Sequence, residues 1–95
     1  MNHAYLLVVE YDNFYDAKYF DSYLFETEID AIEYMQDLIE SYKVEFSENY
    51  DCSIDELMRD YIEVTNESNI YVNWHMEDSC NIEFYIQEKP LLKFN

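Results

Sequence analysis

Residues 27–46 read TEIDAIEYMQDLIESYKVEF and carry the most regular pattern in the chain. Thr27, with Asp30 three residues later, approximates a capping box, in which side chains satisfy the first free amides of a helix. Apolar residues then recur at spacings of three and four, the period of one helical face; they are Ile32, Met35, Ile39, Tyr42 and Phe46. The pattern predicts an amphipathic helix from about residue 28 to residue 44 or 46.

A second, shorter helix follows from a second capping box. Ser53 and Glu56 have the preferred residue types and spacing for this motif. Beyond them a short apolar face predicts a helix that ends near Val64. The polar residues 47–52 before it and 65–69 after it are expected to form loops.

Four stretches have the patterns of strands. Residues 4–11 form an apolar, β-branched run, and in residues 17–26 aromatic residues alternate with others. Residues 70–77 and 82–87 alternate apolar and polar side chains, as in a hairpin with one buried face.

The predicted order is therefore β-β-α-α-β-β. An antiparallel sheet of about four strands, with two helices packed on one face, satisfies this order. A chain of 95 residues is shorter than the length at which chains commonly divide. We therefore expect one acidic α+β domain of two layers that spans residues 1–95.

The charge of the chain excludes several classes of protein. It has 22 acidic and 5 basic residues, a formal charge of −17, and a phosphate backbone would repel that charge. Hydrophobic residues make up 49% of the chain and aromatic residues 19%, far more than a disordered acidic tail carries. No apolar run approaches the roughly 20 residues that span a bilayer, and the N-terminus lacks the basic segment of a signal peptide. We expect a cytoplasmic protein that binds neither nucleic acid nor membrane directly.

The sequence contains no catalytic or metal-binding signature. The chain has no glycine, which excludes glycine-rich phosphate loops and dinucleotide fingerprints. Cys52 and Cys80 match no metal-ligand or redox spacing and are expected to be free thiols. We predict no catalytic residue, metal ligand or cofactor, so a small enzyme or ligand-binding domain is the least favoured alternative.

Acidic residues follow one flank of the long predicted helix. Asp30, Glu33, Asp37 and Glu40 recur at spacings of three, four and three, and Glu26 lies just before the helix. Successive members are roughly 4.5–6 Å apart along the axis, a spacing of the same order as the 3.4 Å between phosphates on one DNA strand. Acidic surfaces also improve solubility, but an ordinary surface helix mixes charges of both signs. We predict that these five residues form a face that binds a basic partner.

Three tyrosines are predicted to supplement the acidic face. Tyr34 lies on the same helix, and Tyr19 and Tyr23 lie on the second predicted strand. Tyrosine rings stack on arginine guanidinium groups, so these side chains are the weaker candidates for partner binding.

The chain is small, strongly acidic, rich in aromatic residues and free of glycine, and its acids are aligned along a helix. In this combination of features it resembles the small phage-encoded inhibitors of bacterial defence. These include anti-CRISPR and anti-restriction proteins that mimic DNA. The resemblance implies a partner that binds nucleic acid, such as a nuclease or CRISPR effector, in the cytoplasm of the bacterial host. It implies inhibition by occupation of the partner's basic channel. An immunity-type protein directed at a basic toxin, or a homodimer formed through exposed aromatic residues, is the alternative.

Overall fold

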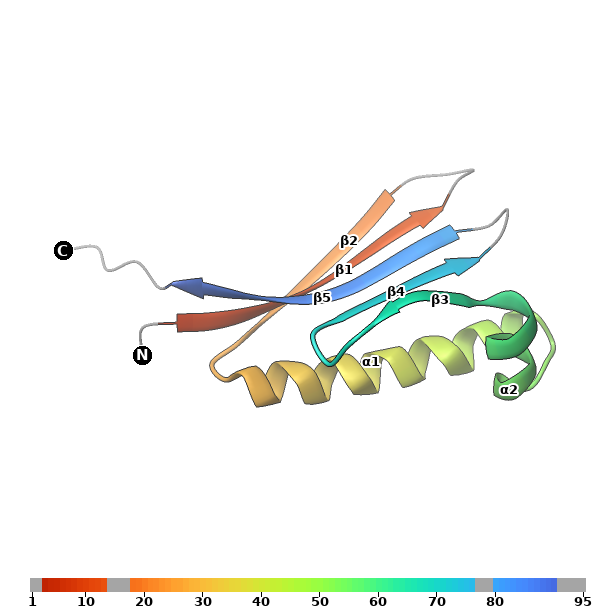
Figure 1. Cartoon of the computed structure of the whole chain (residues 1–95), viewed down its shortest axis with the longest axis horizontal. Coiled ribbons are helices and arrows are strands. Elements are labelled where there is room, and N and C mark those ends of the chain that lie inside the picture. The colour runs from red at the N-terminus through yellow and green to blue at the C-terminus, as the bar shows by residue number, and fades with distance from the viewer. Residues whose placement is uncertain (1–2, 14–17, 77–79, 91–95) are drawn as a thin grey trace.

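In the part of the chain that the structure describes, five antiparallel strands form one sheet, and a long helix lies across one face of it (Figure 1). The computed structural model describes residues 3–13, 18–76 and 80–90. The strands in this part of the chain are β1 (His3–Asn13), β2 (Lys18–Phe25), β3 (Glu63–Glu67), β4 (Tyr71–Met76) and β5 (Cys80–Pro90). Their order in space is β2-β1-β5-β4-β3, so the first and last strands pair at the centre. The helical segments are α1 (Glu28–Asn49), α2 (Ile54–Glu56) and the π-helical turn η1 (Leu57–Tyr61).

The α+β class is correct, but the predicted sheet of about four strands in the order β-β-α-α-β-β is wrong. The additional strand is β3, which pairs with β4 at the edge of the sheet, with a bulge between Val64 and Asn66. All five residues of β3 are exposed. A strand without a buried face has no apolar alternation, so its sequence resembles that of a loop.

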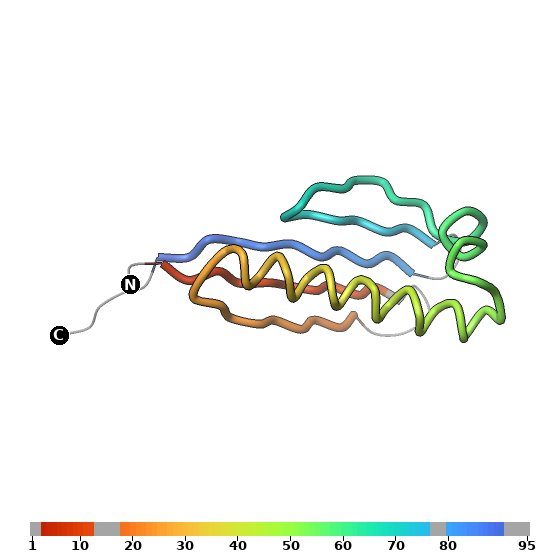
Figure 2. Tube along the Cα trace, turned by 90° about the horizontal axis from the view of Figure 1, so that it is seen from below, coloured from red at the N-terminus to blue at the C-terminus, as the bar shows by residue number. Residues whose placement is uncertain are grey.

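The prediction that two helices pack on one face of the sheet is also wrong. Helix α1 crosses the sheet obliquely, whereas α2 and η1 lie beside the C-terminal end of α1 (Figures 1 and 2). Ser53 caps α2 as predicted, because its hydroxyl accepts a hydrogen bond from the amide of Glu56 at 3.1 Å. The helical segment ends at Tyr61, before the predicted end near Val64, because Ile62 adopts an extended backbone (φ −112°, ψ 124°) and β3 begins at the next residue.

Both ends of α1 have an identifiable cause. The Thr27 hydroxyl accepts a hydrogen bond from the amide of Asp30 at 3.3 Å, as the capping box predicts. The C-terminal end lies at Asn49, beyond the predicted end, because Asp51 supplies the stop. Asp51 adopts φ 53°, and the amides of Asp51 and Cys52 bond to the carbonyls of Glu48 and Ser47. This is a Schellman motif in which aspartate takes the position that glycine usually occupies.

The core lies between α1 and the sheet. Alternate strand residues face the helix, and the largest of them, Trp74 and Phe84, are 1% and 0% exposed. Their rings meet edge to face, with centroids 5.3 Å apart. Helix α1 contributes Met35 and Phe46 to the same cluster. The periodicity of α1 and of β4–β5 therefore indicated the covered face correctly. Cys52 and Cys80 are free thiols, and Cys80 is buried.

Candidate protein-binding surface

Helix α1 presents acidic residues on the side opposite the sheet. Ala31, Met35 and Phe46 are buried against the strands, so residues half a turn away along the helix face outward. Those residues are the predicted Asp30, Glu33, Asp37 and Glu40, and all four are exposed. We call them the acidic ridge. At 1.5 Å per residue the ridge extends about 15 Å along the helix.

One residue of the acidic ridge has a cationic partner. The Oε1 atom of Glu40 lies 3.0 Å from the Nζ atom of Lys43. The remaining ion pairs among the described residues join His3 to Glu88 and Arg59 to Asp60. Within the same residues, Asp30, Glu33 and Asp37 therefore have no opposite charge in contact, and the ridge keeps most of its negative charge.

Part of the acidic sequence also stabilises the helix. Glu28 and Asp30 lie in the first turn of α1, where negative charge interacts favourably with the helix macrodipole. Glu26 is exposed in the bend between β2 and α1. The macrodipole effect ends within the first turn, so it does not account for Glu33 and Asp37 in the middle of the helix.

The structure separates the three predicted tyrosines into two environments. Tyr23 and Tyr34 contact each other, with ring centroids 4.9 Å apart, and help to join β2 to α1. Tyr19 is 55% exposed and lies beside Tyr11, with centroids 5.9 Å apart. Of the three, Tyr19 presents the most ring surface to a partner, whereas Tyr23 is half-buried in an internal contact.

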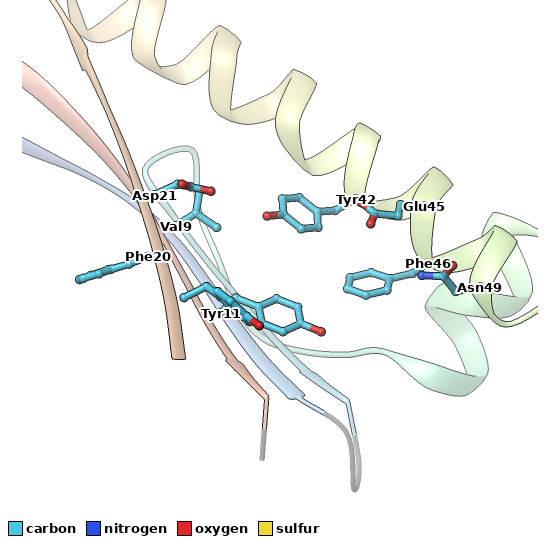
Figure 3. A pocket seen from close by; sticks show the side chains of 9 residues that line it. Val9, Tyr11, Phe20, Asp21, Tyr42, Glu45, Phe46 and Asn49 are labelled. Atoms are coloured by element: carbon cyan, nitrogen blue, oxygen red, sulfur yellow. The ribbon is translucent and has the colours of Figure 1, made fainter. Parts of the chain in front are cut away.

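A cavity of about 520 Å³ lies between the C-terminal half of α1 and strands β1 and β2 (Figure 3). The twist of the sheet carries these strands away from the helix at this end (Figure 1). We call this cavity the aromatic cleft. Its lining residues are Val9, Tyr11, Tyr19, Phe20, Asp21, Tyr42, Glu45, Phe46 and Asn49. Asp21 points toward Tyr42 across the gap, whereas the side chain of Phe20 points to the other side of β2 (Figure 3).

Two tyrosines of the aromatic cleft are held in the protonated form. Burial, and next the neighbouring Cys80, raise the pKa of Tyr11 to about 12. Burial also raises the pKa of Tyr42, with a further contribution from the negative charges of Asp21 and Glu45. Both hydroxyls remain neutral near pH 7, so the negative charge of the cleft comes from its carboxylates.

The sheet face opposite α1 is largely polar. The Tyr71 hydroxyl donates to Glu83 at 2.9 Å, and the Tyr85 hydroxyl donates to Glu10 at 3.1 Å. Near the edge strand β2 this face changes character, since Phe20 and Leu24 are each 66% exposed. Strand β2 thus carries apolar side chains in water at one edge of the sheet.

The aromatic cleft was not predicted from the sequence. The helical period predicts that Tyr42 and Phe46 face the core, which accounts for only part of their surroundings. One available signal was the alternation in β2, which places Asp21 between Tyr19 and Tyr23 on the face directed at α1. A charged residue in the middle of an aromatic face is unusual and could have indicated a cavity.

The described residues were also searched for membrane-spanning helices and for metal sites. No helix in this part of the chain is long and apolar enough to cross a membrane. No cluster of three or more His, Cys, Asp or Glu side chains there is arranged to hold a metal ion. Comparison of the chain with protein-family models, with curated proteins and with solved structures finds no match.

Proposed function

We propose that this protein is an inhibitor that binds the basic, nucleic-acid-binding surface of a bacterial nuclease or defence complex. The observation that carries the proposal is the acidic ridge. Its four residues are exposed along one helix, and of these four only Glu40 has an ion pair within the part of the chain that the structure describes. The chain would act in the host cytoplasm, without contacting nucleic acid itself.

The rigidity of α1 supports this function. The helix is fixed at both ends by its caps and along its length by Met35 and Phe46 in the core. A partner would therefore meet carboxylates that are already in position, without the entropy cost of ordering a flexible polyanion. A basic channel focuses the field of such a ligand and accelerates its association.

The destabilising effect of the negative charge on the fold also supports this function. Like charges at spacings of three and four destabilise a helix slightly, and a net charge of −17 adds repulsion across the fold. Solubility requires a much smaller net charge in a domain of this size. The excess is consistent with a surface that acts through its field.

The test is an inhibition assay with a charge-reversed ridge. We expect the variant Asp30→Lys, Glu33→Lys, Asp37→Lys, Glu40→Lys to fold, because all four side chains are exposed, and to lose inhibition. A nuclease captured from a bacterial lysate at low salt would be assayed for DNA binding in the presence of each variant. Inhibition by the parent chain should weaken as salt increases, because screening shortens the reach of the field to about 8 Å at physiological ionic strength.

A matched pair of neutralising variants controls for net charge. Glu33→Gln with Asp37→Asn removes two charges from the ridge, whereas Glu63→Gln with Glu67→Gln removes two exposed charges from β3 at the edge of the sheet. We expect only the first pair to weaken inhibition. Equal inhibition by both pairs, or a captured nuclease whose DNA binding is unaffected, would contradict the proposal.

A second candidate function, self-association, is supported by the exposed apolar side chains of β2. Phe20 and Leu24 are on an edge strand whose outer backbone groups have no partner strand among the described residues. Exposed edges of this kind pair readily with other strands. Sedimentation of the parent chain and of Phe20→Ser would detect such a homodimer, which the substitution should dissociate.

A further inference from the structure

The aromatic cleft has a continuous wall of rings. The centroids of Tyr19 and Tyr11 are 5.9 Å apart, and those of Tyr11 and Phe46 are 6.5 Å apart with the rings nearly parallel at 19°. Tyr42 continues the wall, with its centroid 6.0 Å from that of Phe46. Tyr42 and Phe46 are one turn apart on α1, and Tyr11 and Tyr19 are paired across β1 and β2. Tertiary packing brings the two pairs together where Tyr11 meets Phe46 (Figure 3).

Two carboxylates face this wall from different elements. Asp21 belongs to β2 and Glu45 to α1, and both line the cleft. Neither has an ion pair within the described residues. Lys18 is on the opposite face of β2 from Asp21, because the two residues are separated by an odd number of positions, and Lys43 is paired with Glu40. The cleft therefore combines aromatic surface with uncompensated negative charge.

This combination excludes several kinds of ligand. An anion would be repelled by both carboxylates. A neutral apolar group would cover Asp21 and Glu45 without giving them a hydrogen bond, which is costly for charged groups. A cation satisfies both features, because aromatic faces attract cations and carboxylates accept charge-assisted hydrogen bonds.

Among protein cations, guanidinium fits better than ammonium. Its planar group stacks on aromatic rings while its edge donates several hydrogen bonds in fixed directions. An ammonium group is a strongly hydrated point charge and gains less from an extended ring surface. A partner arginine could stack on the wall of rings and donate to Asp21 or Glu45.

We propose that the aromatic cleft receives an arginine side chain of a partner protein. The inference rests on the proposed function only in requiring a cationic protein partner. It adds a specific anchor to the long-range attraction of the acidic ridge, and arginine is one of the residues that most often dominate binding energy at interfaces. The ridge would accelerate encounter, and the cleft would slow dissociation.

The proposal can be tested without the partner. The full chain would be titrated with N-acetyl-arginine amide, and amide and aromatic NMR signals would be followed. We expect saturable shifts confined to the cleft, at Asp21, Tyr42, Glu45 and Phe46. N-acetyl-citrulline amide, which has nearly the same shape but no charge, should cause none. The lysine analogue should bind more weakly than the arginine analogue.

Matched variants locate the site. Asp21→Asn with Glu45→Gln should weaken arginine binding about tenfold or more, because hydrogen bonds to charged groups contribute about 1.5–3 kcal/mol. Glu63→Gln with Glu67→Gln has the same change in net charge and should have little effect. Tyr19→Ala keeps both carboxylates and should also weaken binding, through loss of a ring that is already largely exposed.

Three results would overturn the proposal. They are shifts that grow linearly and spread over the whole acidic surface, equal binding of the citrulline analogue, and equal losses in the cleft and control variants. None of these results would affect the acidic ridge, whose test uses a nuclease and different variants. Conversely, loss of the ridge proposal would leave saturable binding of the probe intact.

Discussion

Two clefts flank helix α1, and they differ in charge compensation more than in size. The aromatic cleft, on the side of β2, has a volume of about 520 Å³. The cleft on the side of β3 has a volume of about 610 Å³, and we call it the β3-side cleft. Its lining residues are Met35, Gln36, Ile39, Glu40, Lys43, Glu67, Ser68, Asn69 and Val72. Here Lys43 already occupies the position of a cationic ligand, 3.0 Å from Glu40.

The dimensions of the fold explain why both clefts exist. Five strands at about 4.8 Å spacing make a sheet roughly 19 Å across, whereas a helix with its side chains is about 10 Å wide. One helix therefore leaves both flanks of the covered face partly open. The residues on each flank then decide its chemistry. On the β3 side, aliphatic side chains line the cleft and Lys43 already compensates the charge of Glu40. On the β2 side, rings and unpaired carboxylates line the cleft and can bind a cation.

The largest expected effect comes from truncating Phe84, a buried residue of the core between the sheet and α1. Phe84 lies under α1, with its ring centroid 5.5 Å from Tyr42 and 5.3 Å from Trp74. We expect Phe84→Ala to lower the free energy of unfolding by about 3–5 kcal/mol, because it leaves a void in a closely packed core. Urea denaturation measures this loss. A change below about 1 kcal/mol would show that the helix does not depend on this contact.

The sequence predicts the elements of this structure better than the clefts. Periodicity alone indicates α1, and alternation indicates that Trp74 and Phe84 face the core. Strand β3 has no buried residue, so no local pattern could reveal it. The acidic ridge is a local feature of one helix and could be predicted. The aromatic cleft depends on Asp21 lying opposite Val9 in the sheet while facing the end of α1, and that juxtaposition is not encoded within any one segment.

The second prediction is that a lysine introduced into the aromatic cleft competes with an arginine ligand. Asn49 lines the cleft, is exposed and is the last residue of α1. Asn49→Lys should be tolerated, because positive charge at a helix C-terminus is favourable. Its ammonium group would compete for Glu45, so we expect binding of N-acetyl-arginine amide to weaken about tenfold. The control is Asn69→Lys in the β3-side cleft, which changes the net charge equally. Equal weakening by the control would indicate a general effect of charge.

The third prediction concerns the effect of Tyr11, in the aromatic cleft, on stability at high pH. The β3-side cleft has no tyrosine among its lining residues and serves as the control. The pKa of Tyr11 is raised from about 10 in the unfolded chain to about 12 in the folded protein. The folded state therefore binds its proton more tightly, and this stabilisation is complete below pH 10 and is lost as the pH rises toward 12. Tyr11→Phe should make the fall of Tm between about pH 10 and 12 shallower. Met35→Leu, in the β3-side cleft, should leave the slope unchanged, and equal slopes in all three proteins would refute the assignment.

The smallest effect on stability is expected from removing the ion pair of the β3-side cleft. Lys43→Met removes an ion pair whose carboxylate is largely exposed, and such pairs contribute about 0.3–0.5 kcal/mol. The variant leaves Glu40 and Glu67 without that cation, beside the aliphatic side chains of Met35 and Ile39. If carboxylates alone made an arginine site, this variant would acquire one. We expect no saturable binding of N-acetyl-arginine amide at the β3-side cleft, because no ring there can stack on the guanidinium group. Binding equal to that of the aromatic cleft would show that the rings are unnecessary, and would remove the physical distinction between the two clefts.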